Sequence, residues 1–292
     1  MTRAPFPILP LSRRSLLAAT AALPLAPHVS RAAERRIVAA GGVITEIVYA
    51  LGRQDLLVGV DTTSLFPAAA LKDKAQVGYV RALSPEGVLS LRTTDLLAVE
   101  GAGPPDALKL IAEAGVRVER VGEDTSEAGV SGRIRAIGRF VGAEGEANGL
   151  AARVEEGFAG LKRRREAIAA RKRVLFVLSL QNGRVMVGGN RSSADAIIRA
   201  AGGLNAAETV EGFKPLTDEG LIAAAPDAIL MMSHNDHAAS PDQVFGIASL
   251  GATPAAKTRS LIAMDGLYLL GFGPRTPDAA GELMTALYGK AG

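Results

Sequence analysis

From Arg36 onward, short apolar runs alternate with segments in which apolar residues recur every three or four positions. The short runs, such as "RIVAAG" and "LLVGVD", have the length and composition of buried strands, and the periodic segments have the spacing of amphipathic helices. Strands and helices that alternate in this way form a parallel sheet covered by helices. The pattern predicts strands at 36–41, 56–61, 96–100 and 116–121, and helices at 43–52, 84–92 and 104–115.

The alternation stops between Ser126 and Lys172, where no convincing strand is present and the apolar spacing is helical. After this segment, "RVLFVLSL" resumes the α/β pattern. We therefore predict an α/β protein of two Rossmann-like lobes joined by a single long backbone helix. The expected boundaries are 34–125 for the N-terminal lobe, 126–172 for the linking helix and 173–292 for the C-terminal lobe.

A weak internal repeat indicates that the two lobes are related. "GYVRALSPEGVLSLRTTDLLAV" begins at Gly78, and "GFKPLTDEGLIAAAPDAILMM" begins at Gly212. Each has a glycine, an aromatic residue, a basic residue, a helix start with Ser or Thr at the N-cap, and then an apolar strand. The comparison sets Tyr79 opposite Phe213, so the packing of this loop does not by itself require a hydroxyl. A chemical role for Tyr79 is therefore favoured.

The first 33 residues have the pattern of a secretory signal peptide. A charged region with Arg13 and Arg14 precedes an apolar stretch at 16–25, and small residues near Ala33 supply a cleavage site. The stretch is shorter than the ~20 residues that cross a bilayer. The adjacent arginines favour the twin-arginine route, with an ordinary Sec signal as the alternative. We expect an exported mature chain without a transmembrane segment.

Removal of this segment changes the charge of the chain. The segment holds four of the 33 basic residues and none of the 30 acidic residues, which leaves 29 basic residues against 30 acidic ones and a net charge of −1. This balance gives no electrostatic reason to expect nucleic-acid binding. Cysteine is absent, which excludes disulfides and a thiol nucleophile, and no complete sequence motif of a hydrolase, a metalloprotease or a nucleotide-binding loop is found.

Tyr79 and Arg81 form the first candidate site. A phenolate oxygen is a hard ligand suited to ferric iron, and a nearby guanidinium stabilises the phenolate and lowers the pKa of the phenol. In an extended stretch, residues two positions apart share one face, so both side chains can point into one cleft. The alternative interpretation is a buried core tyrosine beside a surface arginine.

Three segments resemble one known family, the periplasmic haem-binding proteins of bacterial haem ABC importers. "VGYVRALSPEGVLSL" resembles the tyrosine loop of that family, "GLYLLGFGPRTPDAAGELMTAL" its C-terminal motif, and "VLFVLSLQNGRVMVGGNRSSADAIIRAAGGLNAA" the start of its second lobe. The similarity covers essentially the whole mature chain. It implies a periplasmic binding protein, not an enzyme, in which haem lies in the cleft between the lobes. The resemblance further implies that Tyr79 ligates the haem iron and that Arg81 lies beside it.

Two further arginines are candidates for the haem propionates. Arg275 lies in "GFGPRTP", where Gly271 and Gly273 permit close backbone approach and an arginine near a helix start favours anions. Arg191 also precedes an expected helix. Either arginine could instead be an ordinary surface or capping residue.

The resemblance also implies a docking role for Glu86 and Glu219, one at the matched position of each lobe. In proteins of this kind such a pair contacts arginines of the membrane permease, although a first-turn glutamate is also favoured by the helix dipole alone. His234 and His237 follow an expected strand, but two imidazoles are weak evidence for a metal or haem contact.

The sequence thus predicts a monomeric protein that captures haem and delivers it to the permease of an ABC transporter. A binding protein for a ferric siderophore or a corrinoid is the nearer alternative. An exported α/β enzyme is the alternative of a different class, and it lacks an identifiable catalytic constellation.

Overall fold

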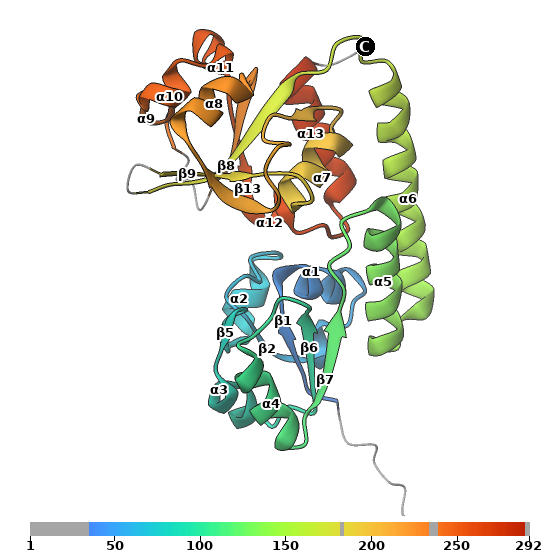
Figure 1. Cartoon of the computed structure of the whole chain (residues 1–292). Helices are drawn as coiled ribbons and strands as arrows, with labels where there is room; N and C mark the ends of the chain where they lie inside the picture. The colour runs from blue at the N-terminus through green and yellow to red at the C-terminus, as the bar shows by residue number, and fades with distance from the viewer. Residues whose placement is uncertain (1–34, 182–183, 234–238, 290–292) are drawn as a thin grey trace, which may run out of the picture. The chain divides into compact units, whose positions relative to one another are not determined.

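The computed structural model describes residues 35–181, 184–233 and 239–289, and the predicted signal peptide at 1–33 lies outside them. In the first lobe, a five-stranded sheet has the order β3-β2-β1-β6-β7, and every neighbouring pair is parallel (Figure 1). The central strands are apolar runs buried on both faces, as is usual for a parallel sheet enclosed by helices. The strands are β1 (Ile37–Ala40), β2 (Leu57–Val60), β3 (Ala75–Gln76), β6 (Asp95–Val99) and β7 (Arg117–Val121).

Helices cover this sheet and form its connections. The predicted start of α3 is confirmed, because Ser84 Oγ accepts a hydrogen bond from Gly87 N at 3.0 Å and Pro85 opens the helix. The strands and helices expected here are all present, and β3 and a small hairpin of β4 (Gly78–Tyr79) and β5 (Ala82–Leu83) are additions. The helices are α1 (Gly42–Ala50), η1 (Gln54–Leu56), α2 (Ala69–Asp73), α3 (Pro85–Ser90) and α4 (Pro105–Glu113).

The linking segment is helical, as expected, but it forms two helices. Helix α5 (Glu127–Val141) ends at Gly142, whose φ of 68° is left-handed, and α6 (Glu144–Glu166) follows. The two helices pack along each other (Figure 1), and a Cβ added to Gly138 would lie 2.1 Å from Ala147 Cβ. The expectation of a single backbone helix is refined accordingly: α6 has 23 residues and is about 35 Å long at 1.5 Å per residue.

The second lobe has a mixed sheet of order β11-β9-β8-β12-β13, with β10 also paired to β8. β8, β10, β12 and β13 pair in parallel, whereas β9 and β11 are antiparallel to their neighbours. Only two residues separate β8 from β9, and so short a connection joins antiparallel strands. The strands are β8 (Arg173–Gln181), β9 (Arg184–Gly188), β10 (Leu204–Asn205), β11 (Phe213–Leu216), β12 (Ala228–Ser233) and β13 (Leu261–Asp265).

The helices of the second lobe include one that returns to the linking segment. Helix α13 packs against α6, where Gly157 lies so close to Pro277 that an added Cβ would be 2.7 Å from the Pro277 Cβ. No helix within the described ranges is long and apolar enough to cross a membrane. The helices are α7 (Ser193–Ala200), α8 (Asp218–Ala224), α9 (Pro241–Phe245), α10 (Ala248–Gly251), α11 (Pro254–Thr258), α12 (Gly266–Leu270) and α13 (Thr276–Tyr288).

Candidate functional site

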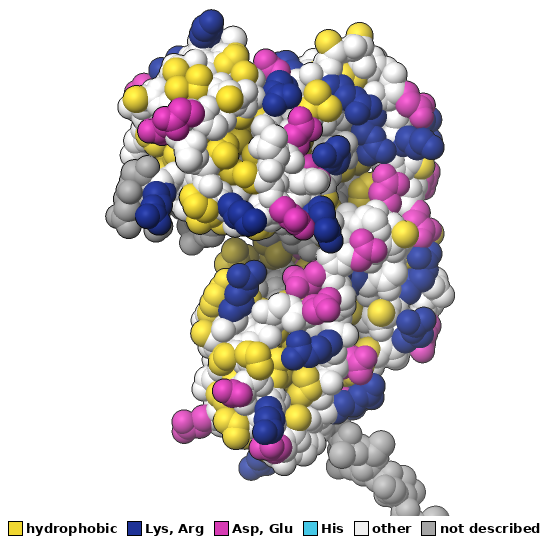
Figure 2. All heavy atoms as spheres, viewed as in Figure 1, with side chains coloured by type: hydrophobic (Ala, Val, Ile, Leu, Met, Phe, Trp, Pro, Cys, Tyr) yellow, Lys and Arg dark blue, Asp and Glu magenta, His cyan; other side chains and the backbone are white. Residues whose placement is uncertain are grey.

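A cavity of about 360 Å³ lies between the two lobes. Its walls come largely from segments that follow strands, the usual place for ligand sites in α/β proteins. Figure 2 shows basic side chains on both borders of the hollow between the lobes. The lining residues are Val43, Arg81, Glu123, Thr125 and Arg133 from the first lobe and linking helix, and Arg191, Ser192, Ser193, Gly212, Phe213, Leu270, Gly271 and Phe272 from the second.

Tyr79 lies on the β4–β5 hairpin and is 47% exposed. The alternative of a buried core tyrosine is therefore wrong. The hairpin needs glycine at position 78, because Gly78 has a φ of 96° and an added Cβ would lie 2.9 Å from Ala82 O. Val80 is 8% exposed and anchors the hairpin, while its sequence neighbours Tyr79 and Arg81 are exposed.

Arg81 lines the interlobe cavity, whereas Tyr79 is not among its lining residues. Within the described residues, no hydrogen bond joins the Tyr79 hydroxyl to Arg81. The stretch is a tight turn and not the extended segment assumed from the sequence. The structure therefore brings Arg81 to the cavity and leaves the tyrosine exposed nearby on the same hairpin.

Arg191 lines the cavity from the second lobe and precedes Ser192, the N-cap of α7. Its φ is 61°, and its guanidinium lies 3.2 Å from the Glu211 carboxylate. Both side chains of this pair are exposed, at 77% and 64%. Exposed ion pairs are weak, so Arg191 can exchange Glu211 for an anionic group of a ligand at small cost.

Arg275 has a partner inside the protein that the sequence did not predict. Its Nε and Nη2 donate to the two Glu46 carboxylate oxygens at 2.9 and 2.8 Å, and it does not line the cavity. Glu46 belongs to α1 of the first lobe and is 5% exposed as a side chain. The expected contact of Arg275 with a propionate therefore stays a prediction, and one with which Glu46 competes.

Arg133 is a cavity residue that sequence reasoning missed. It is 5% exposed and donates to three backbone carbonyls, those of Gly122 at 2.9 Å, Asp124 at 3.1 Å and Phe272 at 2.8 Å. Burial lowers the pKa of its guanidinium. In the sequence, the one signal for a buried Arg133 was its position next to Ile134, beside the apolar face of the expected helix. Arg133 links the end of the first sheet to the second lobe.

Glu86 and Glu219 occupy equivalent positions in the two lobes, the second residue of α3 and of α8. Ser84 and Thr217 cap these helices, and both glutamates are exposed. The two carboxylates are thus available to a partner.

His234 and His237 lie outside the described residues, directly after β12. Among the described residues, no group of three or more His, Cys, Asp or Glu side chains could hold a metal ion.

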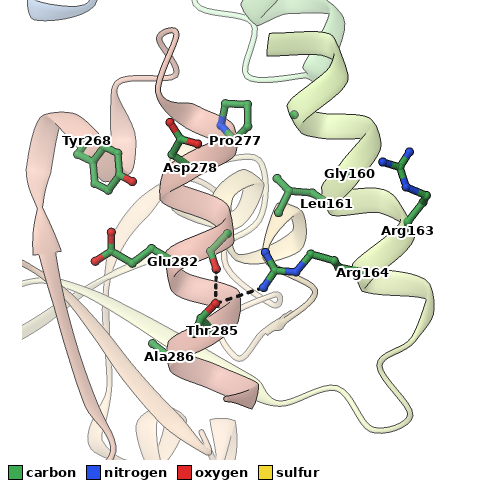
Figure 3. A pocket seen from close by; sticks show the side chains of 12 residues that line it. Gly160, Leu161, Arg163, Arg164, Tyr268, Pro277, Asp278, Glu282, Thr285 and Ala286 are labelled. Atoms are coloured by element: carbon green, nitrogen blue, oxygen red, sulfur yellow. Dashed lines mark hydrogen bonds between the residues drawn. The ribbon is translucent and has the colours of Figure 1, made fainter. Parts of the chain in front are cut away.

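A second hollow of about 950 Å³ lies between α6 and α13 (Figure 3). Arg163 and Arg164 come from α6, and Asp278 and Glu282 come from α13. Tyr268 also lines it, but burial, with the nearby Glu282 and Asp278 carboxylates, raises the pKa of this tyrosine to about 12. A phenol that resists ionisation beside two carboxylates is a poor ligand for iron in an anionic porphyrin. This hollow is therefore the weaker candidate for such a ligand.

Two α/β lobes, a helical link and a cavity with arginines from both sides define a substrate-binding protein that holds its ligand between lobes. The sequence pattern of the periplasmic binding protein family matches residues 37–267, and the chain belongs to this family. Its members and structural neighbours named here are binding proteins.

Solved structures with the same fold include the periplasmic haem-binding protein BhuT in complex with two haems. It is 37% identical, with a TM-score of 0.82, and the match covers 87% of this chain and 97% of BhuT. The haem-binding protein RhuT from Roseiflexus sp. RS-1, in its apo form, is 38% identical with a TM-score of 0.82, over 87% of this chain and 98% of RhuT.

A curated relative is the uncharacterized ABC transporter substrate-binding lipoprotein YvrC of Bacillus subtilis (strain 168). It is 29% identical over 189 residues, which is 64% of this chain. The matched part spans about 60% of the length of YvrC.

Proposed function

We propose that this protein captures haem in the periplasm and delivers it to the permease of an ABC transporter. The observation that carries the proposal is the β4–β5 hairpin, which displays Tyr79 at 47% exposure and sets Arg81 in the wall of the interlobe cavity. The similarity to two haem-binding proteins over nearly their whole length supports haem as the ligand.

In this proposal, the Tyr79 phenolate ligates Fe(III) and the Arg81 guanidinium stabilises its negative charge. Arg191 meets a propionate, because it lines the cavity and is held only by an exposed ion pair. Phe213 lines the same cavity with 39% of its surface exposed and supplies an apolar face for the porphyrin.

Delivery uses Glu86 and Glu219. Each is exposed in the first turn of a short helix, one on each lobe, so the pair can contact basic residues on two subunits of a permease. Export depends on the predicted signal peptide at 1–33, cleaved near Ala33.

The test is a titration of purified mature chain, residues 34–292, with hemin, followed by visible spectroscopy. We expect saturable binding and the charge-transfer band of a high-spin ferric tyrosinate. Tyr79→Phe should remove the band and weaken binding by about 100-fold, the upper end of the range for residues around a metal site. Tyr49→Phe, at the end of α1 and outside the lining of the interlobe cavity, is the matched control and should leave both unchanged.

Saturable binding that survives Tyr79→Phe would direct attention to His234 and His237. If the wild-type chain shows no saturable hemin binding, the haem proposal is wrong. Ferric siderophores and corrinoids would then be titrated in the same way.

A further inference from the structure

We propose that Glu46 and Arg275 form an interlobe clasp that sets the width of the ligand cleft. In this role they are positioning residues, because they fix Arg191 and Phe213 of the second lobe relative to Tyr79 and Arg81 of the first. The proposal rests on the proposed function for its ligand, whereas the clasp itself can be tested without haem.

The contact is a bidentate ion pair between residues far apart in sequence. Arg275 Nε and Nη2 donate to Glu46 Oε1 and Oε2 at 2.9 and 2.8 Å. The Glu46 side chain is 5% exposed and that of Arg275 is 26% exposed. A shielded pair of this geometry is directional, and loss of one partner leaves the other charge buried without compensation.

The guanidinium is also held from its faces. Its central carbon lies 3.6 Å from the ring centroid of Phe66 and 5.1 Å from that of Tyr268. A planar guanidinium can stack on a ring and still pair bidentately with a carboxylate, whereas a lysine ammonium cannot do both. The Glu46 carboxylate therefore holds the Arg275 guanidinium within the plane of the group, and the two aromatic rings restrict its movement out of that plane.

Phe66 connects the clasp to the tyrosine hairpin. It lies in the loop after β2, and Thr62 N of this loop donates to Gly78 O at 2.9 Å. The start of the loop is secured by the buried Asp61, whose carboxylate accepts hydrogen bonds from Gly41 N at 2.8 Å and Thr63 N at 2.9 Å. Arg275 thus packs on the loop that adjoins Tyr79.

The clasp also lies next to the cavity wall. Val43 lines the cavity and precedes Glu46 by one turn of α1. Gly273 fits tightly here, since an added Cβ would be 3.2 Å from Val43 Cγ2 and 3.3 Å from Glu46 Oε1. Just before it, Phe272 O accepts the hydrogen bond from Arg133 at 2.8 Å. The segment from Phe272 to Arg275 is therefore tied to the rest of the protein at two points beside the cleft.

The experiment measures the distance between the lobes and the affinity for hemin in the same variants. Because the chain has no cysteine, Lys109→Cys on α4 and Lys257→Cys on α11 provide two exposed, unique sites for spin labels. Pulsed electron paramagnetic resonance then gives the distribution of the distance between the lobes. Glu46→Gln and Arg275→Lys are the test variants, and Glu156→Gln, at an exposed position on α6, is the control.

We expect a narrow distribution in the wild-type chain, and a broader or shifted one in both test variants. Hemin affinity should fall roughly tenfold in them, within the range known for residues that act through a distant site. The tyrosinate band of the bound form should persist, because Tyr79 itself is untouched. In the Glu46→Gln background, Arg191→Ala should cost less than it does in the wild-type chain, since the clasp no longer presents Arg191 to the ligand.

The clasp is overturned if both test variants keep the wild-type distance distribution, or if they broaden it while hemin affinity stays within twofold of wild type. Arg275→Lys retains the charge, so it serves as the informative variant should Glu46→Gln fold poorly. If the wild-type chain binds no hemin but the distributions differ as expected, the clasp stands as an interlobe lock and the haem proposal fails separately.

Discussion

The turn and helix that begin at Gly78 can be compared with those that begin at Gly212. Both glycines have positive φ, 96° and 68°, and both lead into helices capped by a hydroxyl. Ser84 Oγ accepts from Gly87 N at 3.0 Å, and Thr217 Oγ1 accepts from Gly220 N at 3.1 Å. The local backbone chemistry of the sequence repeat is therefore the same in the two lobes.

The aromatic residues after the two glycines differ in support and in chemistry. Phe213 starts β11, which pairs along four residues with β9 at the edge of the main sheet, and its ring contacts Phe176 edge-on at 6.1 Å. Tyr79 lies on a two-residue strand that pairs only with β5. One lobe thus presents a ring backed by a sheet, and the other presents an oxygen on a two-stranded hairpin outside the main sheet. A repeated backbone unit can therefore present two different side chains on two different strand supports.

The largest expected effect comes from moving the hydroxyl between the lobes. Phe213→Tyr alone should change hemin affinity by less than about threefold, since it keeps the ring, whereas Tyr79→Phe should cost about 100-fold. The double variant with both changes should remain as weak as Tyr79→Phe. Recovery of a tyrosinate band in the double variant, seen by visible spectroscopy, would show that positions 79 and 213 are interchangeable and would contradict the comparison.

The next effect tests the glycines. Gly78→Ala should lower the free energy of unfolding by about 2 kcal/mol, because it combines a positive φ with a close approach to Ala82 O. Gly212→Ala meets no atom within 4 Å and should cost about 1 kcal/mol from its φ alone. Urea titrations followed by circular dichroism measure both. Equal costs would mean that the hairpin relaxes around the added methyl group.

A smaller effect is expected from the two exposed glutamates. Glu86→Ala and Glu219→Ala should leave hemin affinity within twofold, but each should reduce haem uptake through the transporter roughly tenfold, as for an important interface residue. Glu113→Ala, an exposed glutamate on α4, is the control. Uptake assays in vesicles that contain the permease separate the two steps. Normal uptake in both variants would remove the docking role.

The smallest effect concerns the helix caps, where the lobes should behave alike. Ser84→Ala and Thr217→Ala should each lower the free energy of unfolding by about 1 kcal/mol. Ser84→Asp and Thr217→Asp should recover most of this loss, because aspartate also accepts the hydrogen bond. A much larger loss in one lobe, measured by thermal unfolding, would show that the two caps are not equivalent.

The sequence predicted the regular elements of the first lobe well, because short buried strands and amphipathic helices have clear periodicities. It missed the β4–β5 hairpin, since two-residue strands have no periodicity to detect. It also treated the linking segment as a single helix, although Gly142 stands between the two helical patterns. The lobe boundaries at 34–125, 126–172 and 173–292 stay a prediction.

Two cavity residues, Arg81 and Arg191, were predictable because each belongs to a short segment with its own local signal. Tyr79 and Arg81 are two positions apart and were found together. Glu46 lies inside an apolar helical pattern, where a single acid is expected to face solvent, and its partner is 229 residues away. No local pattern can pair such residues, so Arg275 was expected to be free for a ligand.

The position of Arg275 in the chain has a consequence for the order of synthesis. All strands of both sheets precede it, and the first sheet is complete at Val121. During translation, each lobe can therefore form its sheet while the contact with Glu46 is still missing. The two binding surfaces are made first, and their spacing is fixed only when the last helix emerges. A chain cut after β13 would lack the contact with Glu46 and would also lose the buried side chains of α13, such as Leu283 and Leu287.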